Sequence, residues 1–428
     1  MLASFLKNTW PLFLGLAFLM LGNGLQGTLI SWRATYEGFS ASTTGWIMTG
    51  YYAGFLAGSM YAPKMVNEVG YIRVFAALAS LASTAVLLQV LFITAENWFL
   101  MRVITGFCFA GTYVVVESWL NAASENDSRG QMLSFYMLIS FGGMAGGQWL
   151  INVAPPSGFE LFVLSSILLS LALIPLLIRQ VKVPEVSTQT KVYVKELYKI
   201  APAGVVGLFV VSIAHGAMFG MGAVFAIQAG LKVSDIALFM SSFIALGALA
   251  QWPLGWLSDQ FDRRLILMAT SLIAVLLCAI LASVNAQTWL FYLLFALIGA
   301  VSLPMYSIAI AHTNDRLEPE QMAGASSTLV LVLGIGSILG PTTAGYLLTT
   351  YKVEGYLTHI GLAHAVIAFS MVYYMFKREA VADYQQTPYQ VVPARVTSIA
   401  MEALAHEAEE FSHADETIQN DFPASKEE

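Results

Sequence analysis

An arginine lies inside one of the apolar stretches of this 428-residue chain. Arg102 belongs to a run of predominantly apolar residues at positions 98–120, which is long enough to cross a lipid bilayer. A charged side chain costs about 3 kcal/mol at that depth, so it needs a cavity or a partner. A guanidinium in such a place could hold the carboxylate of a substrate. We therefore treat Arg102 as the first candidate for binding chemistry.

The residues around Arg102 share its side of the predicted helix. Arg102, Gly106, Ala110, Tyr113 and Glu117 follow one another at steps of 4, 4, 3 and 4, which places all five on one helix face. Glu117 lies about 22 Å along the axis from Arg102 at 1.5 Å per residue, so the two cannot pair directly. Glu117 is either a titrating partner of Arg102 or a residue at the membrane interface, and the sequence leaves both open.

Other polar residues interrupt the apolar runs. Asn23 and Gln26 share one face of the first run and would either hydrogen-bond into a cavity or pack against another helix. His215 could titrate near neutral pH, although a lone histidine is more often a packing residue. Tyr306 follows Pro304, which suits a broken helix that lines a cavity. These four are secondary candidates for substrate or proton binding.

The elements that would position these side chains are membrane-spanning helices. The chain is 57% hydrophobic and only 11% charged, whereas soluble proteins are usually about one-quarter charged. We expect an all-α membrane protein with twelve spans, at about residues 10–31, 43–63, 74–94, 98–120, 131–153, 159–179, 203–228, 235–257, 265–284, 288–311, 322–350 and 355–376.

Charge and cysteine content exclude several functions. Residues 379–428 contain eleven acidic and two basic residues, so this tail nets −9 and the remaining chain nets +2. We expect no nucleic-acid partner, and an acidic tail that is disordered. Cys108 and Cys278 lie in apolar runs, which excludes a disulfide framework and a metal-ligand cluster. No motif for nucleotide hydrolysis or nucleophilic catalysis occurs. The sequence therefore predicts no enzyme, cofactor or metal.

The loops predict the topology. With the N-terminus inside, fourteen lysines and arginines fall in inside segments and three in outside segments, which places both termini in the cytoplasm. The longest polar break, residues 181–200, divides the spans six and six. We therefore expect an N-terminal half at 1–180, a cytoplasmic central loop at 181–200, a C-terminal half at 201–378 and the tail at 379–428. Such an internally duplicated bundle is typical of a transporter.

One loop motif occurs twice. After the eighth span the chain reads Gly255-Trp-Leu-Ser-Asp259-Gln-Phe-Asp262-Arg263-Arg264. After the second span a counterpart, residues 63–73, has Asn67 where the acid would be, then Gly70 and Arg73. The acid position recurs after 259 − 67 = 192 residues, close to half of the helical part. Two further patterns are an arginine followed by glycines, Arg102 to Gly106, and Gly336-x-x-x-Gly340-Pro341 with Gly345 beyond it.

These motifs resemble those of the major facilitator superfamily, over roughly residues 8–378. Glu117-Ser118, Arg129-Gly130 and the run from Gln251 to Gly255 are similar to its uncharacterised bacterial YcaD-like branch. The resemblance implies two pseudo-symmetric six-helix halves around a central cavity. It also implies that the first, fourth, seventh and tenth helices line this cavity, and that an arginine such as Arg102 takes part in proton coupling.

The resemblance further implies a gating role for the two loops. Asp259, Arg263 and Arg264 would latch the cytoplasmic side, with Asn67, Gly70 and Arg73 as the counterpart set. Because Asn67 replaces the acid and Asp262 replaces the second glycine, neither copy is intact. The alternative is that these charges only set topology and cap helices. Gly106, Gly336, Gly340, Pro341 and Gly345 would allow close packing or bending between moving helices.

We therefore expect a monomeric secondary active transporter of the inner membrane that moves a small solute by alternating access. Arg102, with Glu117 or His215, would couple transport to protons. The single intramembrane arginine favours an anionic or zwitterionic metabolite, while the glycine-rich fifth and eleventh spans and the aromatic content leave drug efflux open. A non-transporting sensor on the same fold is a further alternative. Direction of transport cannot be read from the sequence.

Overall fold

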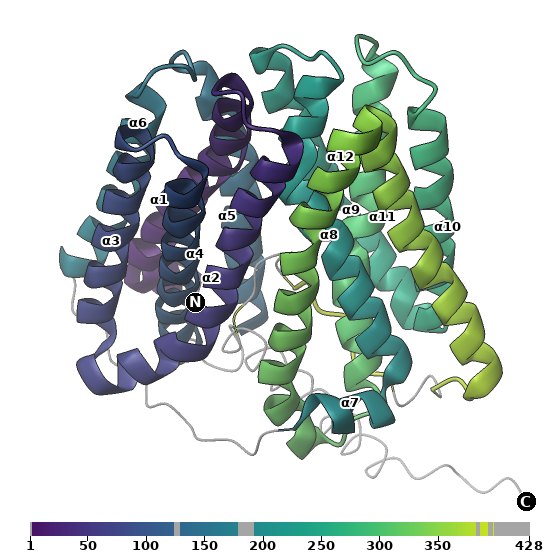
Figure 1. Cartoon of the computed structure of the whole chain (residues 1–428). Helices are drawn as coiled ribbons and strands as arrows, with labels where there is room; N and C mark the ends of the chain where they lie inside the picture. Colours follow the sequence, from purple (N-terminus) through teal and green to yellow (C-terminus); the bar gives the residue numbers. More distant parts are fainter. Residues whose placement is uncertain (1, 124–128, 179–191, 382–385, 393–396, 398–428) are drawn as a thin grey trace, which may run out of the picture.

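The computed structural model describes residues 2–123, 129–178, 192–381, 386–392 and Thr397. The described part is built of helices that run roughly side by side between two ends of one bundle (Figure 1). Nine helical segments within it are long and apolar enough to span a membrane. The prediction of an all-α membrane protein is confirmed, while the count of twelve crossings stays a prediction.

The first half contains the helices before residue 180. These are α1 Leu2–Tyr36, α2 Ala41–Val69, α3 Tyr71–Leu91, α4 Ala95–Ala123, α5 Arg129–Trp149 and α6 Glu160–Ile178, with the short 3₁₀ helix η2 Leu150–Asn152 after α5. Glycines let α2 and α4 approach closely, because a Cβ atom on Gly54 would overlap the Val103 carbonyl and one on Gly106 the Tyr51 carbonyl. This close pair brings Tyr51 beside the helix that carries Arg102.

The second half begins with a short helix, α7 Val194–Ile200, and continues with α8 Pro202–Gln228, α9 Val233–Gln260, α10 Arg263–Leu281, α11 Trp289–Asn314 and α12 Pro319–Lys377. Lys352 interrupts α12 with a φ of 54°, so this segment is two helices joined at a sharp turn. The helix before Lys352 packs tightly on α8, because Cβ atoms on Gly336 and Gly340 would overlap the backbone of Phe209 and Ile213.

The two ends of the bundle differ in charge. The turns between α2 and α3, α9 and α10, and α11 and α12 lie at one end, together with α7 (Figure 1). We call it the basic end, because Arg263, Arg264, Arg316 and Arg378 lie there. Lys352 and the α1–α2 and α8–α9 turns lie at the opposite end. The α2–α3, α9–α10 and α11–α12 turns, which the charge count assigns to one side of the membrane, therefore share one end of the bundle.

The halves meet closely at the opposite end. In the α2–α12 seam, Thr49 and Thr342 share a hydrogen bond of 2.6 Å, and the Ser42 hydroxyl donates to Thr349 over 2.8 Å. A Cβ atom on Gly345 would overlap the Ala41 carbonyl. On the other side of the interface, Trp149 Nε1 of α5 donates to Ser241 Oγ of α9 over 3.1 Å. This end of the interface is closed by direct helix contact.

Candidate functional site

Arg102 is the centre of a buried polar network in the first half. Its side chain is 4% exposed, although it lies within a membrane-spanning helix. Its guanidinium lies 4.4 Å from the centroid of the Tyr51 ring, and Nη1 donates to Gln26 Oε1 at 3.5 Å. The contacts join α4 to α2 and α1. They supply partners that a buried cation needs.

The network continues through Asn23. Its Nδ2 donates to the Tyr51 hydroxyl at 3.2 Å and to the Tyr113 hydroxyl at 2.6 Å. Asn23, Gln26, Arg102 and Tyr113, which the sequence singles out on two separate helices, thus lie in one connected group. The Gln26 Nε2 atom has no hydrogen-bond partner among the described residues. A buried amide donor beside a guanidinium suits a ligand that carries acceptor oxygens.

Glu117 lies one turn beyond Tyr113 on α4 and is 5% exposed. The Tyr136 hydroxyl of α5 donates to one of its carboxylate oxygens at 2.5 Å, and the Thr397 hydroxyl donates to the other. Arg102 and Glu117 belong to the same straight run of helix, so the axial distance of about 22 Å between them holds. Asn23, Tyr51 and Tyr113 occupy the level between them.

In the second half, His215 belongs to a cluster with α11 and α12. Its Nε2 lies 3.0 Å from the Ser302 carbonyl oxygen, and its ring centroid lies 6.2 Å from that of Tyr306. His364 shares a hydrogen bond of 2.9 Å with the Ser302 hydroxyl. The Tyr306 hydroxyl is buried and has no hydrogen-bond partner in the part of the chain that the structure describes. His215 and Tyr306, two sequence candidates, are therefore neighbours.

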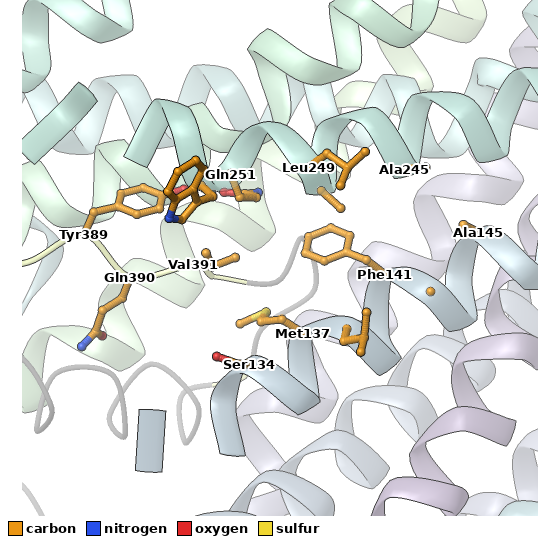
Figure 2. Close-up of a pocket in the computed structure, with 14 residues that line it drawn as sticks. Ser134, Met137, Phe141, Ala145, Ala245, Leu249, Gln251, Tyr389, Gln390 and Val391 are labelled. Carbon is orange, nitrogen blue, oxygen red and sulfur yellow. Dashed lines mark hydrogen bonds between the residues drawn. The ribbon is translucent and has the colours of Figure 1, made fainter. Parts of the chain in front are cut away.

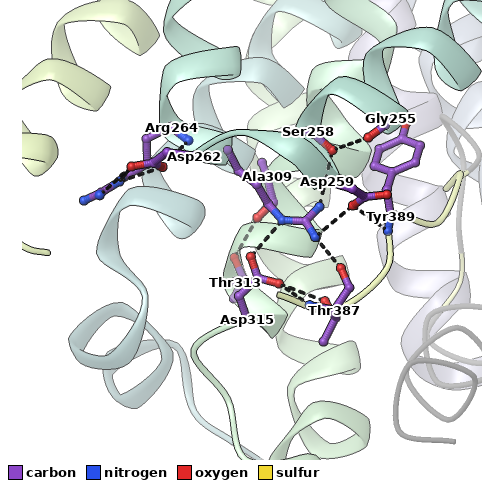
Figure 3. Close-up of polar contacts among 11 residues, drawn as sticks. Gly255, Ser258, Asp259, Asp262, Arg264, Ala309, Thr313, Asp315, Thr387 and Tyr389 are labelled. Carbon is purple, nitrogen blue, oxygen red and sulfur yellow. Dashed lines mark hydrogen bonds and ion pairs between the residues drawn. The ribbon is translucent and has the colours of Figure 1, made fainter. Parts of the chain in front are cut away.

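The second-half loop at the basic end forms an ion-pair cluster (Figure 3). Arg263 is 1% exposed; its Nε donates to Asp315 Oδ2 at 2.8 Å, and Nη2 donates to Asp259 Oδ1 at 3.2 Å. Burial raises the pKa of Asp315, and the nearby Arg263 and Thr387 donors oppose that rise. The predicted loop motif thus links α9, α10 and α11.

Arg264 makes a separate set of contacts. It pairs with Asp262 at 2.7 Å and donates to the carbonyl oxygens of Tyr374 and Arg378, at 3.2 and 2.8 Å. Asp262 also accepts a hydrogen bond from the Arg264 backbone at 2.9 Å and so caps the N-terminus of α10. Burial raises the pKa of Asp262, but its bonds to Arg264 outweigh this and hold the pKa below its usual value.

The first-half loop has none of these contacts. Asn67 and Arg73 are exposed, and no hydrogen bond or ion pair of their side chains occurs among the described residues. Gly70 ends α2 with a φ of 93°, which a side chain would strain.

The glycine and proline positions lie where helices touch. Gly106 faces α2; Gly336 and Gly340 face α8; and Gly345 faces α2 across the halves. The carbonyl of Pro341 lies against Gly45, so it belongs to the same seam between halves. These five residues lie at helix contacts, and their role in helix movement stays a prediction.

A cavity of about 640 Å³ opens between α5 and α9 (Figure 2). Met137, Phe141 and Ala145 line it from α5, Ala245 and Gln251 from α9, and a third wall comes from Tyr389, Gln390 and Val391. The lining is mostly apolar, and its volume is in the range that holds small-molecule ligands.

Comparison with known proteins gives the family. The model of the Major Facilitator Superfamily matches residues 12–247 and again 205–408, so it covers both halves. The chain belongs to the major facilitator superfamily. Its relatives include an uncharacterized MFS-type transporter from Enterobacter sp. (strain 638), 28% identical over 80% of this chain and 89% of that protein. Another is the uncharacterized MFS-type transporter YcaD from Escherichia fergusonii, 26% identical over 79% and 88%.

Solved structures agree with the fold. The nucleoside transporter NupG aligns with a TM-score of 0.70 at 15% identity, over 87% of this chain and 100% of that chain. A variant of the Escherichia coli fucose:proton symporter FucP aligns with a TM-score of 0.54 at 16% identity, over 86% and 99%. The predicted resemblance to the YcaD-like branch and the two-half fold are confirmed. The protein is a multi-pass membrane transporter of the secondary type and not an enzyme.

Several residues of this MFS protein's site were not found from the sequence. Tyr51 and Tyr136 lie in apolar runs rich in aromatic residues, so nothing distinguished them from packing residues. Asp315 and His364 were not connected with Arg263 and His215, because no spacing relates them. The contacts of residues 386–392 with the bundle could not be seen in a polar segment that composition assigns to disorder.

Proposed function

We propose that this MFS transporter moves a small anionic or zwitterionic solute by alternating access, as a monomer, with its basic end in the cytoplasm. The Arg102 network carries the proposal. It presents a guanidinium and the donor Gln26 Nε2 within the first half, and both favour acceptor oxygens of a ligand.

Proton coupling is proposed to run through Glu117. Its carboxyl is buried in a membrane-spanning helix, where a titratable acid is a default candidate for proton transfer. Tyr113 lies one turn away and connects through Asn23 and Tyr51 to the Arg102 guanidinium. A change of charge at Glu117 would therefore act on the neighbouring Tyr113, the near end of the polar network that contains the ligand-binding arginine. Fucose:proton symport by FucP, a protein of similar fold, supports protons as the coupling ion.

Alternating access is supported by how the halves meet. The α2–α12 seam at the opposite end is made of glycine contacts and hydroxyl pairs such as Thr49 with Thr342, with no ion pair among its described residues. Such contacts can separate at low cost when the halves rock. The Arg263 cluster would act as the latch at the basic end, since it fixes the α9–α10 turn to α11.

A second candidate function is efflux of apolar drug-like molecules. The cavity between α5 and α9 supports it, because its lining is dominated by side chains such as Met137, Phe141 and Leu249. This cavity contains neither Arg102 nor Glu117. The two functions therefore predict different dependence on the arginine.

A thermal-shift screen of the detergent-purified protein tests the proposal, with a library of metabolites and drugs at pH 6 and pH 8. We expect an anionic or zwitterionic compound to raise the melting temperature, and Arg102→Ala to abolish this shift. Gradient-driven transport of that compound in proteoliposomes should be lost in Arg102→Ala as well. Arg73→Ala, which removes an exposed arginine, is the matched control and should retain both.

Tyr51→Phe keeps the ring beside Arg102 and removes only the hydroxyl that Asn23 contacts. It is the substitute test variant if Arg102→Ala does not fold. It should weaken the shift without abolishing folding. Unchanged binding and transport in Arg102→Ala would refute the proposal. Shifts by apolar compounds that persist in Arg102→Ala would favour efflux, and a folded protein with no hit would favour a sensor.

A further inference from the structure

A segment that follows the described helices returns into the bundle. Residues 386–392 contact α9, α11 and the residue that follows α11, starting at the basic end. Thr387 donates to Asp315 Oδ1 from both its backbone nitrogen and its hydroxyl, each at 2.9 Å. The Tyr389 backbone nitrogen donates to Asp259 Oδ1, also at 2.9 Å. Figure 3 shows these contacts around the loop cluster.

The segment then reaches deeper into the bundle. The Tyr389 hydroxyl donates to Gln251 Oε1, and the Val392 backbone nitrogen donates to Ser307 Oγ at 3.0 Å. Ser307 lies seven residues before the end of α11, so it is about 10 Å above the basic end. Thr397 donates to Glu117, which belongs to the first half. Residues 386–392 and Thr397 together therefore touch both halves.

The bundle is shaped to receive this segment. A Cβ atom on Gly255 would overlap the Tyr389 ring, so the glycine of the loop motif makes room for it. Val392 is 3% exposed, and Thr397 is fully buried. Val392 also packs within the apolar cluster of α8, α11 and α12. Burial of apolar and hydrogen-bonded groups together distinguishes this docking from a polar chain that rests on a surface.

Backbone groups of the segment complete the charge cluster. Arg263 Nη2 donates to the Thr387 carbonyl, while Asp259 and Asp315 each accept from the segment. Arg263 is shared between Asp315, whose side chain is 1% exposed, and Asp259, whose side chain is 34% exposed. The Thr387 donors therefore supply hydrogen bonds that water cannot reach at the buried Asp315. The segment thus binds to the same groups that the loop motif supplies for gating.

The docked residues also line the cavity. Tyr389, Gln390 and Val391 form one wall of the 640 Å³ space between α5 and α9 (Figure 2). Thr397 on Glu117 and Val392 on Ser307 place the segment across the interface between the halves. Rocking that brings these halves together at the basic end would have to expel it.

On this basis we propose that residues 386–392 with Thr397, which we call the tail plug, are an autoinhibitory ligand of the transporter. The plug fills the opening at the basic end and holds the halves apart there, so that the seam at the opposite end stays closed. This inference rests on the proposed transport function, and release of the plug precedes solute entry.

Cysteine alkylation of the full chain in detergent tests the plug. The two native cysteines, Cys108 and Cys278, are buried and are replaced by alanine. A reporter cysteine at Ala248, which lines the cavity without bonding to the plug, is alkylated by a water-soluble maleimide. We expect Tyr389→Ala, and separately removal of residues 386–428, to speed the reaction about tenfold. Pro388→Ala changes an exposed neighbour of Tyr389 and is the control.

A second reporter, Thr49→Cys in the α2–α12 seam, measures opening of the other end. Its alkylation should also accelerate when the plug is released, because the halves can then rock. An unchanged rate at Ala248→Cys in both plug variants would overturn the inference. A faster rate at Ala248→Cys, with no change at Thr49→Cys in any variant, would support docking of the plug but refute alternating access. Failure of the plug inference and failure of the proposed transport function therefore give different results.

Discussion

The two copies of the loop motif differ in what surrounds them. In the second half, Arg263 and Arg264 are 1% and 2% exposed, and both are paired with acids. In the first half, Arg73 is exposed and Asn67 replaces the acid. The same motif thus forms a buried ion-pair cluster in the second half and, in the first, an exposed turn without such buried pairs among the described residues.

The difference extends to the backbone. Asp262 has an ordinary φ of −52° and caps α10, whereas the equivalent Gly70 has a φ of 93°. One loop is fixed by side-chain bonds and the other by a glycine turn. We infer that the latch at the basic end belongs to the second half alone, and that the plug binds to the latch there. Three substitutions test this asymmetry.

The largest effect is expected for Arg263→Ala. It leaves Asp315, whose side chain is 1% exposed, as a buried carboxylate without its cation. Breaking a buried ion pair in this way typically costs about 3–5 kcal/mol. The melting temperature in detergent should fall clearly below that of the unsubstituted protein. Arg73→Ala is the matched first-half variant and should change it little, so equal losses would show that the loops are equivalent.

Gly70→Ala should have an intermediate effect. No atom lies within 4 Å of the position that its Cβ would take, so the cost comes from backbone strain alone, about 1–3 kcal/mol. Gly142 of α5 also has open space around it but lies in a helix without a positive φ. Gly142→Ala should therefore be neutral or stabilising in the same melting assay. A neutral Gly70→Ala would mean that the first turn does not need its glycine.

The smallest effect is expected for Asp262→Ala, about 1 kcal/mol for a lost N-cap. Asp262 is itself partly exposed, and Arg264 keeps its bonds to the carbonyl oxygens of Tyr374 and Arg378. The pKa of Asp262 lies below its usual 3.8 in the folded protein, so its contribution is present in full above pH 3.8. That contribution is lost as the pH falls through the folded pKa. The difference in melting temperature between the variant and the unsubstituted protein should therefore shrink below pH 3.8. A difference that stays constant with pH would contradict the ionic origin of the cap.

The fold was predictable because membrane-spanning helices have a distinctive amino-acid composition. Runs of about 20 apolar residues and the bias of lysine and arginine follow from the bilayer itself. Arg102, Asn23, Gln26 and Tyr113 could be singled out because polar side chains are costly in such runs. The contacts that join these residues through Tyr51 could not be predicted, because they depend on how closely Gly54 and Gly106 let α2 and α4 approach.

Contacts between distant segments were the part that sequence could not supply. Asp315 lies 52 positions from Arg263, and Tyr389 lies 130 positions from Asp259, with no periodicity to connect them. For residues 386–392, composition predicts disorder because a polar segment cannot bury a core of its own. The bundle supplies that core, through Gly255, Ser307 and the cluster around Arg263. The composition of a segment does not show whether another part of the chain offers a surface to which it can bind.

The position of the plug in the chain also orders events during biosynthesis. Residues 386–392 and Thr397 follow every helix that they bind, so they leave the ribosome only after α4, α9 and α11 have been made. The helices of both halves can therefore enter the bilayer while the space at the basic end is still unfilled. A newly made molecule would pass through a short interval in which it is assembled but not yet closed, and quality control of the protein would meet that form first.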